Sequence, residues 1–166
     1  MIGDSHYTQF YVTLELFAFT MNLLVISKNV VLLFFSWELV GLCSYLLINY
    51  WKLNQNSNLS SIKAVLYNKL GDIFLLILIG RMFQCIYSCD IHLIFISMVY
   101  FSFFSWYWMN PIHILSWSII IAAFTKSTKV PFSGWIADAM AAPTPVSALL
   151  HSATMVTAGV FLILRF

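Results

Sequence analysis

Four apolar segments of this chain are each long enough to cross a lipid bilayer. They cover residues 10–26, 30–50, 61–81 and 143–164, and about 20 predominantly apolar residues span the hydrocarbon core as a helix. A helix also satisfies its own backbone N–H and C=O groups, for which lipid offers no partner. We therefore expect an all-α membrane protein with about five transmembrane helices, in a single membrane domain covering residues 1–166.

The segments between these spans are less regular. Residues 27–29 predict a tight turn, and the polar residues 54–61 predict a loop in which Ser60 or Ser61 caps the next helix. Residues 91–108 are apolar but shorter than the other spans, with tryptophans near the end, so they either span the membrane or lie in its interface.

The composition supports a membrane protein and argues against other classes. Of the 166 residues, 61% are hydrophobic and 8% are charged, whereas about 25% are charged in soluble domains. The net charge of +2 is small and the Lys and Arg residues are dispersed, so the charge suggests neither nucleic acid as a partner nor a polybasic lipid-binding segment. Cys43, Cys85 and Cys89 contain no CxxC pair, which disfavours an iron–sulfur or zinc site and redox chemistry in this chain.

Two lysines and a proline interrupt the apolar pattern in the second half of the chain. Residues 111–124 predict a membrane helix that breaks at Lys126, Lys129 and Pro131 before residues 132–140 resume it. A charge at bilayer depth costs at least ~2.5 kcal/mol, so such groups usually line an aqueous path or a proton relay. We expect Lys126 to carry a proton whose binding a nearby acid controls. Lys129 either stays neutral or faces water, and an ordinary interfacial loop is the alternative for both lysines.

Glu38 lies about one third of the way into the predicted helix 30–50. Gly41 and Tyr45 follow it on the same helical face, at i+3 and i+7. A carboxylate in this position is a candidate relay group. The alternative is a glutamate near the end of the span that reaches water, with Trp37 marking the interface.

The predicted helix 61–81 carries Lys69 and Asp72 at i and i+3 on one face. A mutual ion pair would lower the cost of placing both groups in the membrane. The pair is either a structural contact or part of a relay that includes Asp72. Lys63, near the start of the segment, is expected to extend its ammonium to the membrane surface.

The last predicted helix carries a stripe of polar and small residues. Ser147, His151, Thr154 and Ala158 fall at i, i+4, i+7 and i+11. Histidine titrates near neutral pH and has two ring nitrogens, so His151 can pass protons. The stripe favours a water-lined path, and a histidine packed in the core is the alternative.

Three stretches together resemble the antiporter-like subunits of respiratory complex I, most closely the NADH dehydrogenase subunit 5 family. They are SWELVGLCSYLLINYW, KAVLYNKLGDIFLL and TKSTKVPFSGWIADAMAAPTPVSALLHSATMVTAGVFLILR, of which the last is the most specific. In that family five helices form one of two inverted repeats, and the seventh transmembrane helix is broken at its central lysine. The resemblance implies that residues 1–166 form one such antiporter-like repeat, broken near residues 126–131, with an interfacial helix at about 91–108.

The resemblance also implies roles for individual residues. Glu38 matches the glutamate of the family's fifth helix, Lys126 the lysine at the break, and His151 the histidine of the eighth helix. Asp72 matches an acid of the sixth helix, and Lys69 stands where the family commonly has Arg. These matches imply a proton half-channel in which Glu38 tunes Lys126, and His151 passes protons toward the second repeat.

Two departures from the family pattern stand out. Lys129 occupies a position where relatives typically carry Gln, which places an extra cation near Lys126. In addition, 166 residues cannot hold the preceding helices, the second repeat and the lateral helix of a full subunit. We therefore expect either a split subunit, whose complementary fragment is another polypeptide, or a truncated chain.

The function implied is that of a proton-translocating membrane subunit of NADH:ubiquinone oxidoreductase, in the mitochondrial inner membrane rather than a bacterial plasma membrane. Its partners would be other membrane-arm subunits, the complementary fragment and lipids. We expect no cofactor in this chain, with FMN, iron–sulfur clusters and ubiquinone on other subunits. The alternatives are a subunit of a multi-subunit sodium/proton antiporter, whose chains share the PTPVSALLHSATMV pattern, and a scaffold that conducts no protons.

Overall fold

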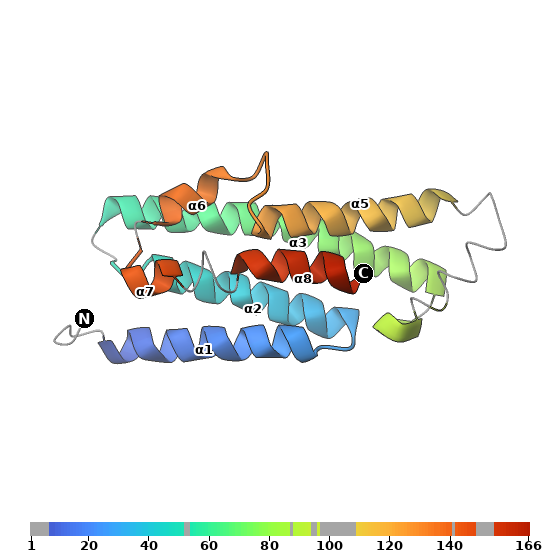
Figure 1. The fold of residues 1–166 in the computed structure, drawn as a ribbon, viewed down its shortest axis with the longest axis horizontal. Helices are drawn as coiled ribbons and strands as arrows, with labels where there is room; N and C mark the ends of the chain where they lie inside the picture. The colour runs from blue at the N-terminus through green and yellow to red at the C-terminus, as the bar shows by residue number, and fades with distance from the viewer. Residues whose placement is uncertain are drawn as a thin grey trace.

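The chain folds into a bundle of helices that run side by side (Figure 1). The computed structural model describes residues 7–51, 54–86, 88–93, 96, 109–140, 142–148 and 155–166. Its helices are α1 (Tyr7–Ile26), α2 (Val30–Ile48), α3 (Gln55–Ile86), α5 (Met109–Lys126), α6 (Gly134–Ala139), α7 (Thr144–Ser147) and α8 (Met155–Arg165). These described residues contain no strand, and one isolated bridge joins Asn29 to Asp90. The predicted all-α class is confirmed.

Neighbouring helices in the chain pack against each other in turn. Helix α1 packs on α2, α2 on α3, α3 on α5, and α5 on α8, while α6 lies along α3. The outside of the bundle is apolar, because Val12, Phe19, Leu66 and Trp117 are each at least 60% exposed. Such an apolar exterior suits a lipid environment better than water.

The first two helices agree with the apolar runs that predicted them. Among the described residues, α1 and α2 are the two helices long and apolar enough to cross a membrane. The turn between them ends at Asn29, whose side-chain oxygen accepts a hydrogen bond from the Val31 amide at 2.9 Å and so caps α2. The turn also pairs with the segment after α3, since the Val30 amide donates to the Cys89 carbonyl at 2.9 Å.

Helix α3 is longer than expected, and the prediction of a loop over residues 54–61 was wrong. The helix begins at Gln55 and has 32 residues, or ~48 Å at 1.5 Å per residue, against a hydrocarbon core of ~30 Å. The side-chain oxygen of Asn54 accepts a hydrogen bond from the Asn56 amide at 3.1 Å. Ser60 and Ser61 therefore do not cap the helix; their hydroxyls donate to carbonyls of the preceding turn.

The predicted break after α5 is confirmed. Helix α5 ends at Lys126, and the amide of Lys129 donates to the carbonyl of Phe124 at 3.1 Å. Between them, Thr128 has a φ of 53°. A residue in this left-handed region together with a bond back to the third-last carbonyl is a common way of ending a helix. The chain resumes as the short helix α6, which begins at Gly134.

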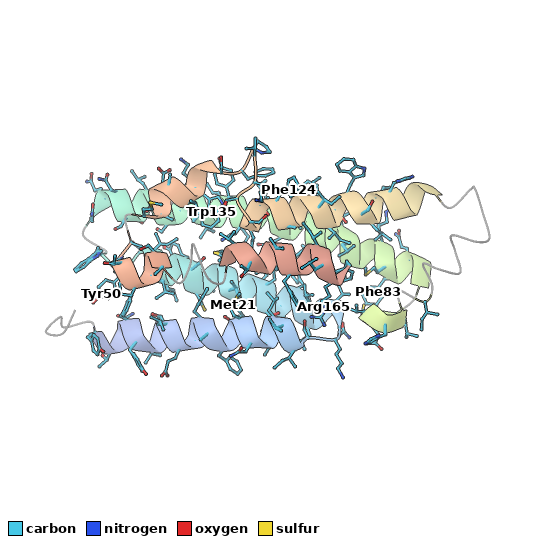
Figure 2. All side chains as sticks on the ribbon, viewed as in Figure 1. Met21, Tyr50, Phe83, Phe124, Trp135 and Arg165 are labelled. Atoms are coloured by element: carbon cyan, nitrogen blue, oxygen red, sulfur yellow. The ribbon has the colours of Figure 1, made fainter. Side chains whose placement is uncertain are left out.

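The C-terminal part contains α7 and α8 where a single helix over residues 143–164 was predicted. Residues 149–154 between them, which include His151, lie outside the described residues, as does most of the predicted interfacial segment 91–108. Arg165 lies at the end of α8 and is labelled in Figure 2. It donates to the carbonyl of Val25 at 3.1 Å and also to that of Ser27. These bonds tie α8 to the C-terminal end of α1.

Candidate functional site

The side chain of Lys126 is completely buried at the point where α5 ends. Its exposed fraction is 0%, and its Nζ donates a hydrogen bond to the backbone carbonyl oxygen of Trp37 at 2.6 Å. The same nitrogen lies 4.2 Å from the centroid of the Trp37 ring, within the range of a cation–π contact. The break therefore delivers an ammonium group to the centre of the bundle, against α2.

Two glycines let the neighbouring helices approach the end of α5. A Cβ atom on Gly71 of α3 would collide with the Thr125 hydroxyl and lie 3.3 Å from the Thr125 Cβ. A Cβ atom on Gly159 of α8 would lie 2.6 Å from the carbonyl oxygen of Ala123. The last turn of α5 is thus held between α3 and α8 by contacts that tolerate no side chain.

Trp135 of α6 binds the backbone at the end of α5. Its indole Nε1 donates to the carbonyl of Thr125 at 3.1 Å, and its side chain is 0% exposed. The last carbonyls of a helix lack partners within the helix. Trp135 thus satisfies one of the backbone acceptors that the break leaves open beside Lys126.

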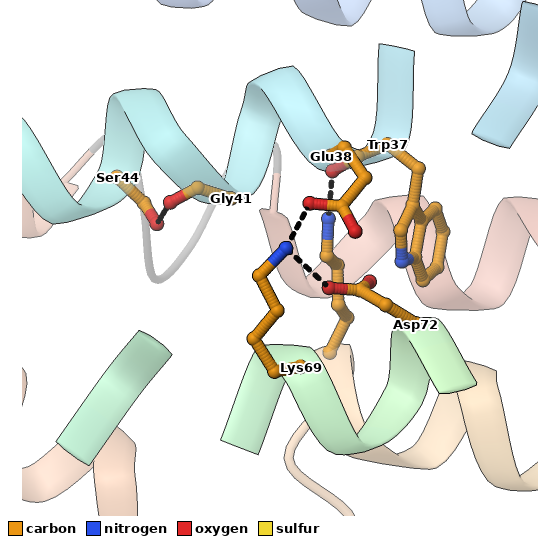
Figure 3. Close-up of polar contacts among 7 residues, drawn as sticks. Trp37, Glu38, Gly41, Ser44, Lys69 and Asp72 are labelled. Carbon is orange, nitrogen blue, oxygen red and sulfur yellow. Dashed lines mark hydrogen bonds and ion pairs between the residues drawn. The ribbon is translucent and has the colours of Figure 1, made fainter. Parts of the chain in front are cut away.

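Three charged side chains form a cluster between α2 and α3 (Figure 3). Lys69 forms an ion pair with Glu38, and its Nζ lies 3.7 Å from Oδ2 of Asp72. The side chain of Asp72 is 7% exposed, that of Glu38 30% and that of Lys69 57%. The predicted Lys69–Asp72 pair is confirmed, and Glu38 joins it from the neighbouring helix.

The two carboxylates of this cluster act on Lys126 through space. Glu38 directly follows Trp37, whose carbonyl oxygen binds the Lys126 Nζ, and Asp72 faces Glu38 across the contact of α2 with α3 (Figure 3). Among the described residues, the ion pairs of Glu38 and Asp72 are both with Lys69. In a medium of low dielectric constant such interactions remain strong across several ångströms. A change in the protonation of either acid would therefore change how firmly Lys126 holds its proton.

A pocket of about 390 Å³ opens beside the charged cluster. Its polar lining comes from Glu38 and Tyr45 on α2 and from Asn68, Lys69 and Asp72 on α3. The prediction that Tyr45 shares a face with Glu38 agrees with this arrangement. The pocket gives the charged cluster a route toward the outside of the helix pair.

Of the other predicted site residues, Lys129 lies apart from the charged cluster, and His151 is not among the residues that the structure describes. Lys129 is exposed on the turn after α5, whereas Lys126 is fully buried. Lys63 is half-exposed and forms an ion pair with Asp138 of α6, which joins α3 to α6.

Several residues of the site were not found from the sequence. The alternative for Glu38 made Trp37 a marker of the membrane interface, but the Trp37 side chain is fully buried against Lys126. Gly71 and Gly159 lie far from Lys126 in the sequence, and only the helix packing brings them to the break, whereas Trp135 is nine residues after Lys126 and returns to it through the turn. Their signal was weak, although a glycine directly before a membrane acid, as in Gly71–Asp72, already indicates close helix packing.

Metal-ligating side chains do not gather in the described part of the chain. No group of three His, Cys, Asp or Glu residues among the described positions could hold a metal ion.

Comparison with known proteins identifies one family over most of the chain. A family model described as "NADH:quinone oxidoreductase/Mrp antiporter, TM" matches residues 27–166. NADH-ubiquinone oxidoreductase chain 5 of Dictyostelium citrinum is 45% identical over 99% of this chain and 25% of its own length. The same chain of the red alga Chondrus crispus is 43% identical over 100% of this chain and 26% of its own. The chain thus spans about a quarter of the length of these curated relatives.

A solved structure extends the likeness to the fold. The chain superposes on part of an Mrp complex from Dietzia sp. with a TM-score of 0.85 and 35% sequence identity. The match covers 93% of this chain and 16% of that chain. The helices described above therefore have an antiporter-like membrane fold.

Proposed function

Because the chain belongs to the NADH:quinone oxidoreductase/Mrp antiporter transmembrane family, we propose that it is one repeat of a proton-translocating membrane subunit of NADH:ubiquinone oxidoreductase. The repeat forms a half-channel, and the chemistry of electron transfer takes place on other subunits. Several relatives of this chain are named NADH-ubiquinone oxidoreductase chain 5, which supports this assignment.

The burial of Lys126 carries the proposal. An ammonium with no exposed surface, at the end of a broken helix, is expensive to maintain in a membrane protein and is usually functional. Its partners are a neutral carbonyl and an aromatic ring. Since none of these neutralises the charge, Lys126 can lose its proton without breaking an ion pair.

The relay begins at the charged cluster and ends beyond Lys126. An ionised carboxylate close to a lysine favours the charged ammonium, and Lys69 pairs with both Glu38 and Asp72. Moving Lys69 away from the acids, or protonating one of them, changes the proton affinity of Lys126. His151 receives the proton released from Lys126 and passes it toward the second repeat of the subunit.

The partners and location follow from the same assignment. The chain assembles with other membrane-arm subunits of the complex and with the remainder of its own subunit, supplied as a complementary fragment. FMN, iron–sulfur clusters and ubiquinone belong to other subunits. Its relatives are chain 5 of eukaryotic oxidoreductases, which favours the mitochondrial inner membrane, where the potential makes each translocated charge cost ~2.3 kcal/mol per 100 mV.

A sodium/proton antiporter subunit is the second candidate function. The similarity to part of an Mrp complex, with a TM-score of 0.85, favours it. The identity to chain 5 relatives reaches 45%, against 35% for that structure, so the oxidoreductase is preferred. A scaffold that conducts no protons fits less well, because its core would have no reason to bury Lys126 close to two acids.

The substitution Lys126→Met tests the proposal in the assembled complex. Methionine fills a similar volume without a proton, so we expect proton translocation to fall by about a hundredfold or more while assembly persists. Pumping is measured as protons moved per NADH oxidised in sealed membrane vesicles, and assembly by native electrophoresis. Lys28→Met, which changes an exposed lysine in the turn between α1 and α2, is the matched control.

Three results would decide against the assignment. Normal pumping by the Lys126→Met complex would remove the lysine from the proton path. Transport that requires sodium, without quinone-linked activity in the purified assembly, would favour the antiporter. Loss of assembly in both Lys126→Met and Lys28→Met would point to a scaffold.

A further inference from the structure

The amide of Asn68 is the most conspicuous polar group that the relay does not use. Asn68 is 3% exposed on α3, and among the described residues neither its Nδ2 nor its Oδ1 has a hydrogen-bond partner. Oδ1 of Asp72, one turn further along, also lacks a partner there. A buried polar group without a partner destabilises the folded protein. Three unsatisfied polar atoms on one helical face therefore indicate that something else binds them.

These atoms face the pocket between α2 and α3. Asn68 and Asp72 both line it, and residues at i and i+4 of a helix lie about 6 Å apart. The volume of about 390 Å³ exceeds the ~30 Å³ that one water molecule occupies in the liquid. A water needs two to four polar partners, and Asn68 offers a donor and an acceptor while Asp72 offers an acceptor.

The rest of the lining limits what else can occupy this position. Leu42, Ile62, Val65 and Leu66 line the pocket with hydrocarbon. A lipid tail would pack against these residues, but it would leave the amide and the carboxylate oxygen without partners. Water satisfies the polar atoms at the base of the pocket in a way that a hydrocarbon chain cannot.

We propose that Asn68 holds bound water in the pocket between α2 and α3, which hydrates Asp72 and connects the charged cluster to the entrance of the half-channel. The inference rests on the proposed function in giving this water a role in proton entry, although the hydration itself is independent of it. Asn68 is a positioning residue: it orients the water, and Asp72 exchanges the proton.

Hydration of the pocket can be measured with a thiol introduced into its wall. In the assembled complex, we expect Val65→Cys to react with a membrane-impermeant cationic methanethiosulfonate reagent at least about tenfold faster than Leu76→Cys. Leu76 lies on the same helix, is 53% exposed and does not line the pocket, so its thiol would face lipid. The parent protein gives the background from its native cysteines. Equal reaction rates at the two positions would overturn the proposal.

The substitution Asn68→Leu tests the role of the amide itself. Leucine has nearly the same shape, so in a dry pocket it would remove two unsatisfied groups and raise the Tm of the complex. With bound water, we expect instead no gain in Tm, slower labelling of Val65→Cys, and pumping reduced by about tenfold. Asn68→Ser, which keeps a hydroxyl, should restore most of the pumping, and Ser61→Ala, which removes a hydroxyl already bonded within α3, is the control.

The outcomes separate this inference from the proposed function. A dry pocket, with pumping still lost in Lys126→Met, would refute the bound water alone. A hydrated pocket together with normal pumping in Lys126→Met would refute the relay and keep the water site. If Asn68→Leu fails to assemble, the labelling of Val65→Cys in the otherwise unchanged complex still decides.

Discussion

The ammonium of Lys126 on α5 lies 2.6 Å from the backbone carbonyl oxygen of Trp37 on α2, and 4.2 Å from the centroid of its ring. One residue thus supplies both a hydrogen-bond acceptor and an aromatic face. The acceptor belongs to the backbone and survives any substitution of Trp37, whereas the ring does not. The two contributions can therefore be separated by mutation.

Replacing Trp37 by Leu should weaken the site by removing the aromatic face. A cation–π contact contributes ~0.5–2 kcal/mol, so we expect pumping to fall by up to about thirtyfold in vesicles. Trp37→Phe keeps a ring and should retain most of the activity. Equal losses in the two variants would show that the volume of the side chain matters, and not its aromatic face.

Adding a methyl group at Gly71 should push α3 away from the end of α5. Overpacking of this kind typically costs ~1–3 kcal/mol, so we expect Gly71→Ala to lower the Tm of the solubilised complex and to reduce pumping. Gly159→Ala should act similarly from α8. The control is Gly80→Ala on α3, where nothing lies within 4 Å of the added atom; it should be neutral or stabilise the helix by ~1 kcal/mol.

Replacing Trp135 by Phe should loosen the turn after α5. The carbonyl of Thr125 would lose its donor, at a cost of ~1–3 kcal/mol for a buried group. We expect faster amide hydrogen exchange in residues 127–133, measured by mass spectrometry, and a smaller change in α1. Unchanged exchange in the turn would mean that another group or a water satisfies this carbonyl.

Replacing Lys69 by Arg should preserve the charged cluster. The planar guanidinium can bind two carboxylates at once, as Lys69 does with Glu38 and Asp72. We expect pumping within about twofold of the parent for Lys69→Arg and a loss of about tenfold or more for Lys69→Met. The measurement is the number of protons moved per electron in both variants. An unchanged ratio in Lys69→Met would show that pumping does not require a cation at this position.

Removing the charge of Lys129 should have little effect. Its side chain is exposed, and the interaction of an exposed cation with its surroundings is worth at most ~1 kcal/mol. We expect Lys129→Gln to pump within about twofold of the parent across the pH range. A loss as large as that of Lys126→Met would place Lys129 in the proton path despite its exposure.

The parts of the fold that depend on local sequence were predicted well. Apolar runs gave α1 and α2 closely, and Pro131 with Lys126 indicated the break after α5. The start of α3 was missed because polar residues usually indicate a loop. Here the hydroxyls of Ser60 and Ser61 bond within the helix instead of competing with it.

The contacts between helices could not be predicted from the spacing of residues along the sequence. Lys69 and Asp72 are neighbours on one helix, so their pairing was predictable, but Glu38 reaches Lys69 across 31 residues of sequence. The contact of Lys126 with Trp37 spans 89 residues. The prediction that a nearby acid controls the proton on Lys126 therefore named residues of α2, α3 and α5. It did not give the contacts that join these helices.

The bonds from Arg165 to the end of α1 connect residues separated by 138 positions. A ribosome makes α1 long before it makes Arg165, so the last carbonyls of the newly inserted α1 lack this donor until α8 has been made. A nascent chain arrested before α8 would keep that terminus open to water or to the wrong neighbour. The first helix of the bundle is therefore fully satisfied at its end only after the last described helix has been made.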